Sequence, residues 1–225
     1  MKETPIIFDA ESINAILAGK KTMTRRVITV PWHKGKRCQP YEPYYEIRDG
    51  VLWFADEYGD RVQWPCPYGK PGDILWVKET WRCEELEDGL DGVRYRADHA
   101  FVPIENSQDS ADLWCEARGN GDGPVYGWKS PLYMPRWASR ISLEVVSRRA
   151  ERLQAITEGD AFREGVERIE LSPSALNGNP VHPMTGTYID AFKARWDALN
   201  AKRGFPCADN PGVWVVEFKL REVKK

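Results

Sequence analysis

The sequence is poor in the residues that build metal sites and disulfide frameworks. Among its 225 residues are only three histidines and five cysteines, and no two cysteines form a C-x-x-C pair. Structural zinc sites and disulfide scaffolds both use paired, regularly spaced ligands. The scattered residues are His33, His99 and His182, with Cys38, Cys66, Cys83, Cys115 and Cys207. We therefore expect no metal site, disulfide framework or cofactor.

Long apolar runs and a strong net charge are also missing. No segment approaches the roughly 20 apolar residues that cross a bilayer. The first residues, "MKETPIIFDAESI", lack the apolar core of a secretion signal. The net charge of −2 gives no overall attraction to nucleic acid, so any basic surface must be local. These absences predict a cytoplasmic protein without a membrane partner.

Tryptophan and proline are abundant, with ten and sixteen residues, in a chain of otherwise ordinary globular composition. The segment 31–70 is rich in Trp, Tyr, Pro and charge, and 82–135 is a second irregular stretch. The Gly-rich "RGNGDG" in the latter lacks the Lys-Ser/Thr that follows a phosphate-binding loop, so we interpret it as a turn. We find no internal repeat and expect one domain with two insertions.

The first predicted helix is well marked at both ends. Asp9 is a suitable N-cap, and Phe8 before it can pack on Ile13 as a hydrophobic staple. Gly19 then supplies a C-terminal stop. The neighbouring "PIIF" and "TMTRRVITV" are rich in β-favouring residues, which predicts a strand on each side of the helix.

The remaining elements predict an α+β fold with a mostly antiparallel sheet. Asp49-Gly50 lies between β-favouring runs and indicates a tight hairpin. Further strands are expected at "ILWVKETW", "VRYRA", "RISLEVVS" and "VWVVEFKL". "ITEGDAFREG" predicts a short helix capped by Thr157 and stopped by Gly165, and "TYIDAFKARWDALNAKRG" predicts an amphipathic one. The sheet should therefore be flanked by two or three helices.

Two places could hold chemistry at the ends of these helices. Lys21 and Thr24, in "AGKKTMTRR", lie where the chain leaves a helix and enters a strand. They are either solvated residues favoured by the helix dipole or part of a site. Glu164 immediately precedes Gly165, where the negative end of the dipole disfavours a carboxylate by about 0.3–1 kcal/mol. It is either an exposed residue that tolerates this cost or an acid or base in a site.

A third group of candidates interleaves aromatic rings with cations. The segment "WKSPLYMPRWASR" is rich in residue types that stack on bases and pair with phosphates. They are Trp128, Lys129, Tyr133, Arg136, Trp137 and Arg140. Tryptophans are equally common in protein cores. The segment is therefore either a substrate-binding surface or a packed stretch of the core.

The order of several of these segments resembles the ASCH domain family, and more narrowly the ASCH proteins carried by bacteriophages and prophages. The matching segments are "ILAGKKTMTRR", "GDILWVKETW", "MPRWASRISLEV" with "AITEGDAFREGV", and "VWVVEFKL". The resemblance covers nearly all of residues 1–225, with 31–70 and 82–135 as insertions relative to small members. It implies a PUA-like pseudo-barrel, a relative of RNA-binding domains, in the cytoplasm of a bacterial host.

The resemblance also implies a site. In small bacterial ASCH enzymes that hydrolyse N4-acetylcytidine, catalysis is attributed to a Lys, a Thr and a Glu, which correspond to Lys21, Thr24 and Glu164. Arg26 corresponds to the motif arginine, and Arg25 beside it is a further candidate for substrate binding. The expected function is amide hydrolysis on a modified nucleoside or nucleic-acid base. The alternatives are RNA binding without catalysis, ribonuclease activity, or a phage accessory protein that binds a host protein.

Overall fold

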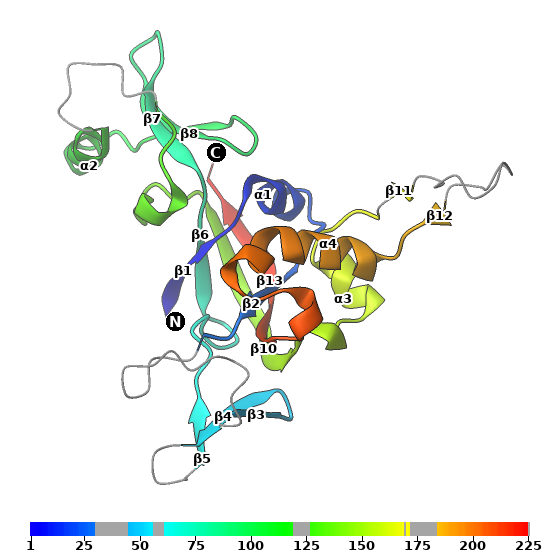
Figure 1. The fold of residues 1–225 in the computed structure, drawn as a ribbon. Coiled ribbons are helices and arrows are strands. Elements are labelled where there is room, and N and C mark those ends of the chain that lie inside the picture. Colours follow the sequence, from blue (N-terminus) through cyan, green and yellow to red (C-terminus); the bar gives the residue numbers. More distant parts are fainter. Residues whose placement is uncertain (30–44, 56–60, 119–126, 169, 172–183, 225) are drawn as a thin grey trace, which may run out of the picture. The chain divides into compact units, whose positions relative to one another are not determined.

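The computed structural model describes residues 1–29, 45–55, 61–118, 127–168, 170–171 and 184–224 (Figure 1). Helices combine with mostly antiparallel strands, which confirms the predicted α+β class. The chain divides into two compact units. The first unit contains Met1–Gly19, Pro71–Val145 and Lys219–Lys225, and the second contains Lys20–Lys70 and Val146–Phe218. The expectations of a single ASCH domain and of a PUA-like pseudo-barrel stay predictions.

In the first unit, strand β1 (Glu3–Ile7) runs parallel to β6 (Ile74–Lys78), and β10 (Ile141–Arg152) begins antiparallel to β6. Helix α1 (Ala10–Leu17) follows β1 and starts as predicted, because the Asp9 side chain accepts a hydrogen bond from the Ser12 N–H at 2.8 Å. The buried face of α1 carries Ile13 and Ile16. Beyond it, Gly19 has φ of +70°, a conformation that favours glycine at a helix end.

The second predicted insertion forms its own layer in the first unit. Strands β7 (Trp81–Glu85), β8 (Asp91–Tyr95) and β9 (Phe101–Pro103) form an antiparallel sheet, and α2 (Gln108–Arg118) follows. Trp81, Tyr95 and Trp114 are buried in the apolar cluster of this layer. The strand predicted at "ILWVKETW" is confirmed as β6 over Ile74–Lys78, but its last residue, Trp81, begins β7 in a different sheet.

A buried charge cluster joins the ends of these strands. The guanidinium of Arg140 donates to Glu79 and to Asp98, with four N–O distances of 2.9 Å. It also lies 4.1 Å from the ring centroid of Tyr95. Arg140 and Glu79 are almost fully buried, so each must have its charge compensated inside the protein.

In the second unit, the sheet order continues as β10-β13-β2, with β2 (Met23–Val27) antiparallel to β13 (Gly212–Val223). Helices α3 (Glu158–Arg163) and α4 (Tyr188–Asn200) lie next to each other (Figure 1). Thr187 and Asp190 form a capping box at the start of α4. The two helices share an apolar cluster with the two strands. Its buried residues are Met23, Leu153, Ile156, Ala161, Val166, Ala191, Phe192, Trp196, Cys207, Val213 and Val215.

The predicted hairpin is confirmed in the first insertion. Strand β3 (Tyr45–Arg48) pairs with β4 (Val51–Ala55), which pairs with β5 (Arg61–Trp64). Asp49 and Gly50 have φ of 52° and 72° in the turn. A Cβ at Gly50 would lie 3.1 Å from the Cβ of Arg149, and the carbonyl of Gly50 accepts from the Ala150 N–H at 2.7 Å. The turn is thus fixed against β10.

The three predicted helices correspond to α1, α3 and α4, but the described residues contain a fourth, α2, so two or three helices is an underestimate. Residues 119–123 of the predicted "RGNGDG" turn lie outside the described residues. The remaining short elements are β11 (Glu170–Leu171) paired with β12 (Met184–Thr185), and 3-10 turns at Pro131–Tyr133, Leu153–Ala155, Ala201–Arg203 and Cys207–Asp209. Within the described ranges, no helix has the length and apolar character needed to cross a membrane.

The Arg140 cluster gives a stability prediction for the first unit. Replacing Arg140 with Met leaves the buried Glu79 carboxylate without its cation, which should lower the free energy of unfolding by about 3–5 kcal/mol. Arg136→Met is the matched control, because Arg136 makes a more exposed ion pair with Glu3 at 2.8 Å. That control should change stability by less than about 1 kcal/mol. Urea unfolding followed by circular dichroism measures both, and equal effects would contradict the assignment.

Candidate active site

The backbone places Lys21 beside the end of α3. Lys21 lies between α1 and β2, and its neighbour Thr22 bonds on both sides: its N–H donates to the carbonyl of Arg163, and its carbonyl accepts from the N–H of Phe218, both at 2.9 Å. One bond reaches the last residue of α3 and the other reaches β13. Two independent backbone contacts therefore fix the position from which the Lys21 side chain starts.

Helix α3 ends as the sequence predicts. Thr157 caps its start, Glu164 is its C-cap, and Gly165 leaves the helix with φ of +78°. The last carbonyls of a helix have no partner within it. Lys21 supplies one, since its Nζ donates to the backbone carbonyl of Glu164 and to Oε2 of the same residue, both at 2.7 Å. The two residues lie 143 positions apart in sequence.

Arg25 lies on the opposite side of Glu164 from this contact. Its Nη1 is 3.4 Å from Oε1 of Glu164, and its Nη2 lies 2.6 Å from Glu151 and 2.8 Å from Asp160. The side chain is completely buried. Three carboxylates of the protein itself therefore bind the guanidinium of Arg25.

The ion pairs continue from Arg25 toward the edge of the unit. Arg149 contacts Glu151 at 3.0 Å, Asp160 at 2.9 Å and Glu217 at 3.2 Å. Arg163 contacts the same oxygen of Glu217 at 2.5 Å. These ion pairs link four cations to four carboxylates, so their formal charges cancel. We call this set of eight residues the charged array: Lys21, Arg25, Arg149 and Arg163 with Glu151, Asp160, Glu164 and Glu217.

Burial dominates the electrostatics of Lys21. Loss of hydration lowers the pKa of its ammonium, while the charge and hydrogen bond of Glu164 act to raise it. The positive charges of Arg26 and Arg195 lower the pKa of Lys21 further. A lowered pKa makes the Lys21 ammonium a stronger acid than an exposed lysine, so this end of the array can take part in proton transfer.

Strand alternation separates Thr24 and Arg26 from Arg25. Side chains alternate between the two faces of a strand, so Arg25 shares its face with Met23, and Thr24 shares the other face with Arg26. Thr24 is buried, with 4% of its surface exposed. Burial raises the pKa of Tyr68, whereas the charges of Arg26 and Arg203 act to lower it. Tyr68, Arg26 and Arg203 are therefore electrostatic neighbours.

The other four predicted binding residues belong to the first unit. The ring of Trp128 lies 4.7 Å from the guanidinium of Arg82. Lys129 donates to the carbonyl of Ala117, and its Nζ lies 5.4 Å from the ring centroid of Trp81. The remaining two, Arg136 and Trp137, contact Glu3 and Trp81. The structure thus brings Lys21 and Glu164 together and places these four in a separate group.

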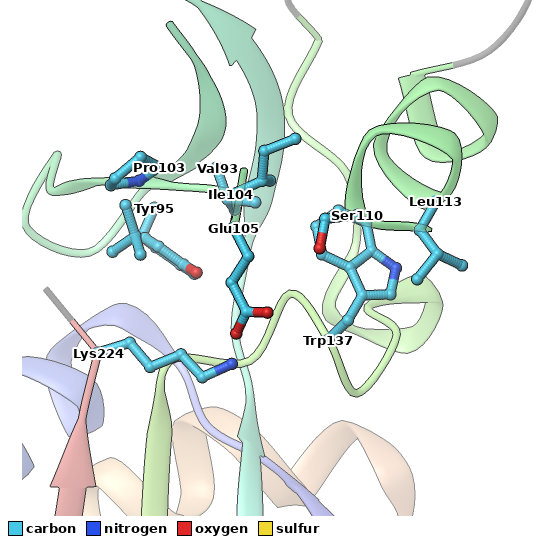
Figure 2. A pocket seen from close by; sticks show the side chains of 10 residues that line it. Val93, Tyr95, Pro103, Ile104, Glu105, Ser110, Leu113, Trp137 and Lys224 are labelled. Atoms are coloured by element: carbon cyan, nitrogen blue, oxygen red, sulfur yellow. The ribbon is translucent and has the colours of Figure 1, made fainter. Parts of the chain in front are cut away.

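Two hollows adjoin this group. The larger, of about 400 Å³, is lined by Trp81, Lys129, Tyr133 and Trp137 with four neighbouring residues. The smaller, of about 160 Å³, is shown in Figure 2, where the ends of the Glu105 and Lys224 side chains point toward each other. Trp137 lines both hollows. Among the residues that the structure describes, no group of three or more His, Cys, Asp and Glu is arranged to hold a metal ion.

Comparison with protein-family models, with curated proteins and with solved structures finds no match to this chain. The site therefore has to be interpreted from its own geometry.

Three carboxylates of the array were not predicted from the sequence. Asp160 lies in the first turn of α3, where an acidic residue is expected simply from the helix dipole. Glu151 shares a strand face with Arg149 in "RRAER", and this two-residue spacing was the available signal for a polar face of β10. Glu217 is the first charged residue after the apolar run at the start of β13. No sequence pattern pairs Glu151 and Asp160 with Arg25, which lies 126 and 135 positions away, or Glu217 with Arg149, which lies 68 positions away.

Neighbouring lysines offer a matched test of the buried contact. Lys21→Met leaves Glu164 buried without its ammonium partner, and the free energy of unfolding should fall by about 3–5 kcal/mol. Lys20 pairs with Glu167 at 2.9 Å, but both side chains are exposed. Lys20→Met should therefore leave urea unfolding unchanged. Comparable losses in the two variants would show that the Lys21 contact contributes no more than a surface pair.

The lowered pKa of Lys21 predicts the direction of a pH effect. Between that lowered pKa and the ordinary value of 10.5, the unfolded chain binds more protons at Lys21 than the folded protein does. The free energy of unfolding therefore rises with pH across this window. The stability difference between wild type and Lys21→Met should grow as the pH is raised through this window toward 10.5. A difference that shrinks over that range would mean that the folded protein holds the Lys21 proton more tightly.

Proposed function

We propose that this chain is a hydrolase that cleaves the amide of an acylated nucleobase, with N4-acylcytidine as the type substrate. The observation that carries the proposal is the buried Lys21–Glu164 contact, with Nζ and Oε2 2.7 Å apart. Lys21 and Thr24 lie in one of the segments that resemble ASCH domains, "ILAGKKTMTRR", and Glu164 lies in another, "AITEGDAFREGV". The same resemblance makes a PUA-like fold and a phage or prophage origin part of this proposal.

The pair can carry both proton transfers that amide hydrolysis needs. Glu164 accepts a proton from water as the water oxygen adds to the acyl carbon. The Lys21 ammonium then donates a proton to the leaving nitrogen as the carbon–nitrogen bond breaks. The products are a carboxylic acid and the free amino group of the base. A final proton transfer from Glu164 to Lys21, across their contact, restores the starting charges.

Thr24 has two roles open to it in this scheme. Its hydroxyl either attacks the acyl carbon itself, forming an ester that water then hydrolyses, or it orients the acyl oxygen. It lies on the Arg26 face of β2, and not on the face from which Arg25 enters the charged array. Thr24→Val keeps the shape and removes the hydroxyl, so it measures what the hydroxyl contributes.

The charges around Thr24 support a nucleoside or RNA as the partner. Arg26 and Arg195 both act on Lys21, and Arg26 and Arg203 act on Tyr68. Arginine combined with an aromatic ring is suited to a phosphorylated, flat ligand. We therefore assign Arg26 to substrate binding.

RNA binding without catalysis is the second candidate, and one observation favours it. The hollow lined by Trp81, Lys129, Tyr133 and Trp137 combines rings with an ammonium, and Tyr133 is 79% exposed. Such surfaces stack on bases of single strands. This candidate requires no bond to break, and its affinity should fall steeply with salt.

One incubation separates these functions. Wild-type protein is mixed with N4-acetylcytidine and other N4-acylcytidines, each offered both as the free nucleoside and within an RNA oligonucleotide, and the products are identified by mass spectrometry. The proposal predicts release of the acid and of unmodified cytidine. RNA that is retained on the protein with all acyl groups in place supports the binding module. Shortened RNA indicates a ribonuclease. Either of these two results without deacylation overturns the hydrolase.

Lys21→Arg tests the proton transfer directly. Arginine keeps the positive charge but does not give up its proton in proteins, so kcat should fall by about 10²–10⁴-fold while substrate affinity is retained. Lys20→Arg serves as the control, because Lys20 is exposed and pairs only with Glu167 among the interactions described for it. Steady-state kinetics of both variants give the comparison. Full activity in Lys21→Arg would exclude Lys21 as the proton donor.

A further inference from the structure

The burial of Arg25 separates it from any substrate. Its side chain has no exposed surface, and its guanidinium is in contact with Glu151, Asp160 and Glu164. It also lies 5.8 Å from the ring centroid of Phe192, in the apolar cluster of the second unit. A residue enclosed in this way can influence a reaction only through the groups that it holds.

Glu164 is held from two sides. Lys21 contacts Oε2 and the backbone carbonyl, and Arg25 contacts Oε1. The torsion that turns a carboxylate group is broad, so a single contact leaves its orientation loosely defined. Two cations on the two oxygens restrict that rotation. Without Arg25, Oε1 would be a buried oxygen with no cation beside it.

Arg25 is in turn fixed by residues outside the reacting pair. Glu151 accepts from both Nε and Nη2, at 3.1 and 2.6 Å, and Asp160 accepts from Nη2 at 2.8 Å. Arg149 contacts both of these carboxylates but makes no contact with Glu164 among those described. The planar fork of an arginine has five donors in fixed directions on three nitrogens, whereas the three donors of a lysine share one nitrogen, so the arginine is better suited to hold three separate carboxylates.

We infer that Arg25 is a positioning residue, which fixes the carboxylate of Glu164 so that Oε2 stays on the Lys21 ammonium. The inference rests on the proposed function only for its effect on catalysis. The restriction that Arg25 places on the Glu164 carboxylate is a property of the folded protein and can be measured without a substrate. Arg25 also suits this role because a guanidinium stays protonated and does not compete for the proton that Lys21 and Glu164 exchange.

Two variants of Arg25 and one of Arg149 form the experiment. Arg25→Gln removes the charge, and Arg25→Lys keeps the charge but loses the planar fork. Arg149→Gln is the matched control, since it removes one cation from Glu151 and Asp160 without touching Glu164. Circular dichroism first establishes that each full-length variant is folded.

The first measurement is the exchange of the Lys21 ammonium protons with water, followed by ¹⁵N NMR. Protons held by two acceptors in a buried site exchange slowly, and a loosened Glu164 should speed this exchange several-fold. The increase is expected in both Arg25 variants and not in Arg149→Gln. The inference is overturned if the Lys21 protons of the Arg25 variants exchange at the wild-type rate, or if the rate rises equally in Arg149→Gln.

The wild-type protein provides a check that needs no folded variant. The guanidinium protons of Arg25 should exchange far more slowly than those of Arg48, which is 66% exposed. Equal exchange at the two arginines would contradict a fixed Arg25.

The second measurement is kinetic and uses the acylcytidine that the wild type hydrolyses. A misplaced carboxylate should lower kcat about 10²-fold with KM unchanged, in Arg25→Lys as well as in Arg25→Gln. Wild-type kcat in Arg25→Lys would show that only the charge matters, which overturns the positioning role. If the wild type hydrolyses nothing, the proposed function fails, and the exchange measurements still decide whether Arg25 holds Glu164.

Discussion

The second unit depends on one buried contact, in which a lysine closes the end of a helix and also neutralises the carboxylate of the same residue. The ammonium of Lys21 is taken out of water, and this costs far more than a surface charge does unless donors and charge are both satisfied. The carbonyl and carboxylate of Glu164 supply both at once. Because Glu164 ends α3, the contact ties β2 to a helix that lies about 140 residues later in the chain.

Each unit contains a buried charge cluster, and the two differ in what they can do. In the first unit, Arg140 is satisfied by Glu79 and Asp98, and all its strong contacts are to carboxylates. An arginine keeps its proton, so this cluster can only hold strands together. In the second unit, the array ends in Lys21, whose pKa is lowered by burial. A lysine, unlike an arginine, can give up its proton, so under the proposed function this end of the array is where the proton transfer takes place.

The sequence predicted the elements whose signals are local and left out those set by distant partners. Caps and stops at Asp9, Thr157 and Gly165 mark α1 and α3 because they act within a few residues. The end of β6 at Lys78, before Trp81 begins β7, has no local signal, since no glycine or proline interrupts "ILWVKETW". Helix α2 buries only Trp114 and therefore lacks a clear apolar stripe. Arg25 was expected at a binding surface because nothing local shows that three carboxylates surround it.

The two faces of β2 carry different residues of the candidate site. Arg25 faces the charged array and the apolar cluster, whereas Thr24 and Arg26 face the other way. Lys21, which precedes the strand, contacts Glu164, and the positive charge of Arg26 lowers the pKa of Lys21. The spacing in G-x-K-x-x-T-x-R thus has a physical meaning under the proposed function. The threonine and the second arginine lie two residues apart on one face of β2. Arg25, between them, lies on the other face, where it contacts Glu164. A one-residue shift of β2 against β13 would exchange the faces and separate all of these roles.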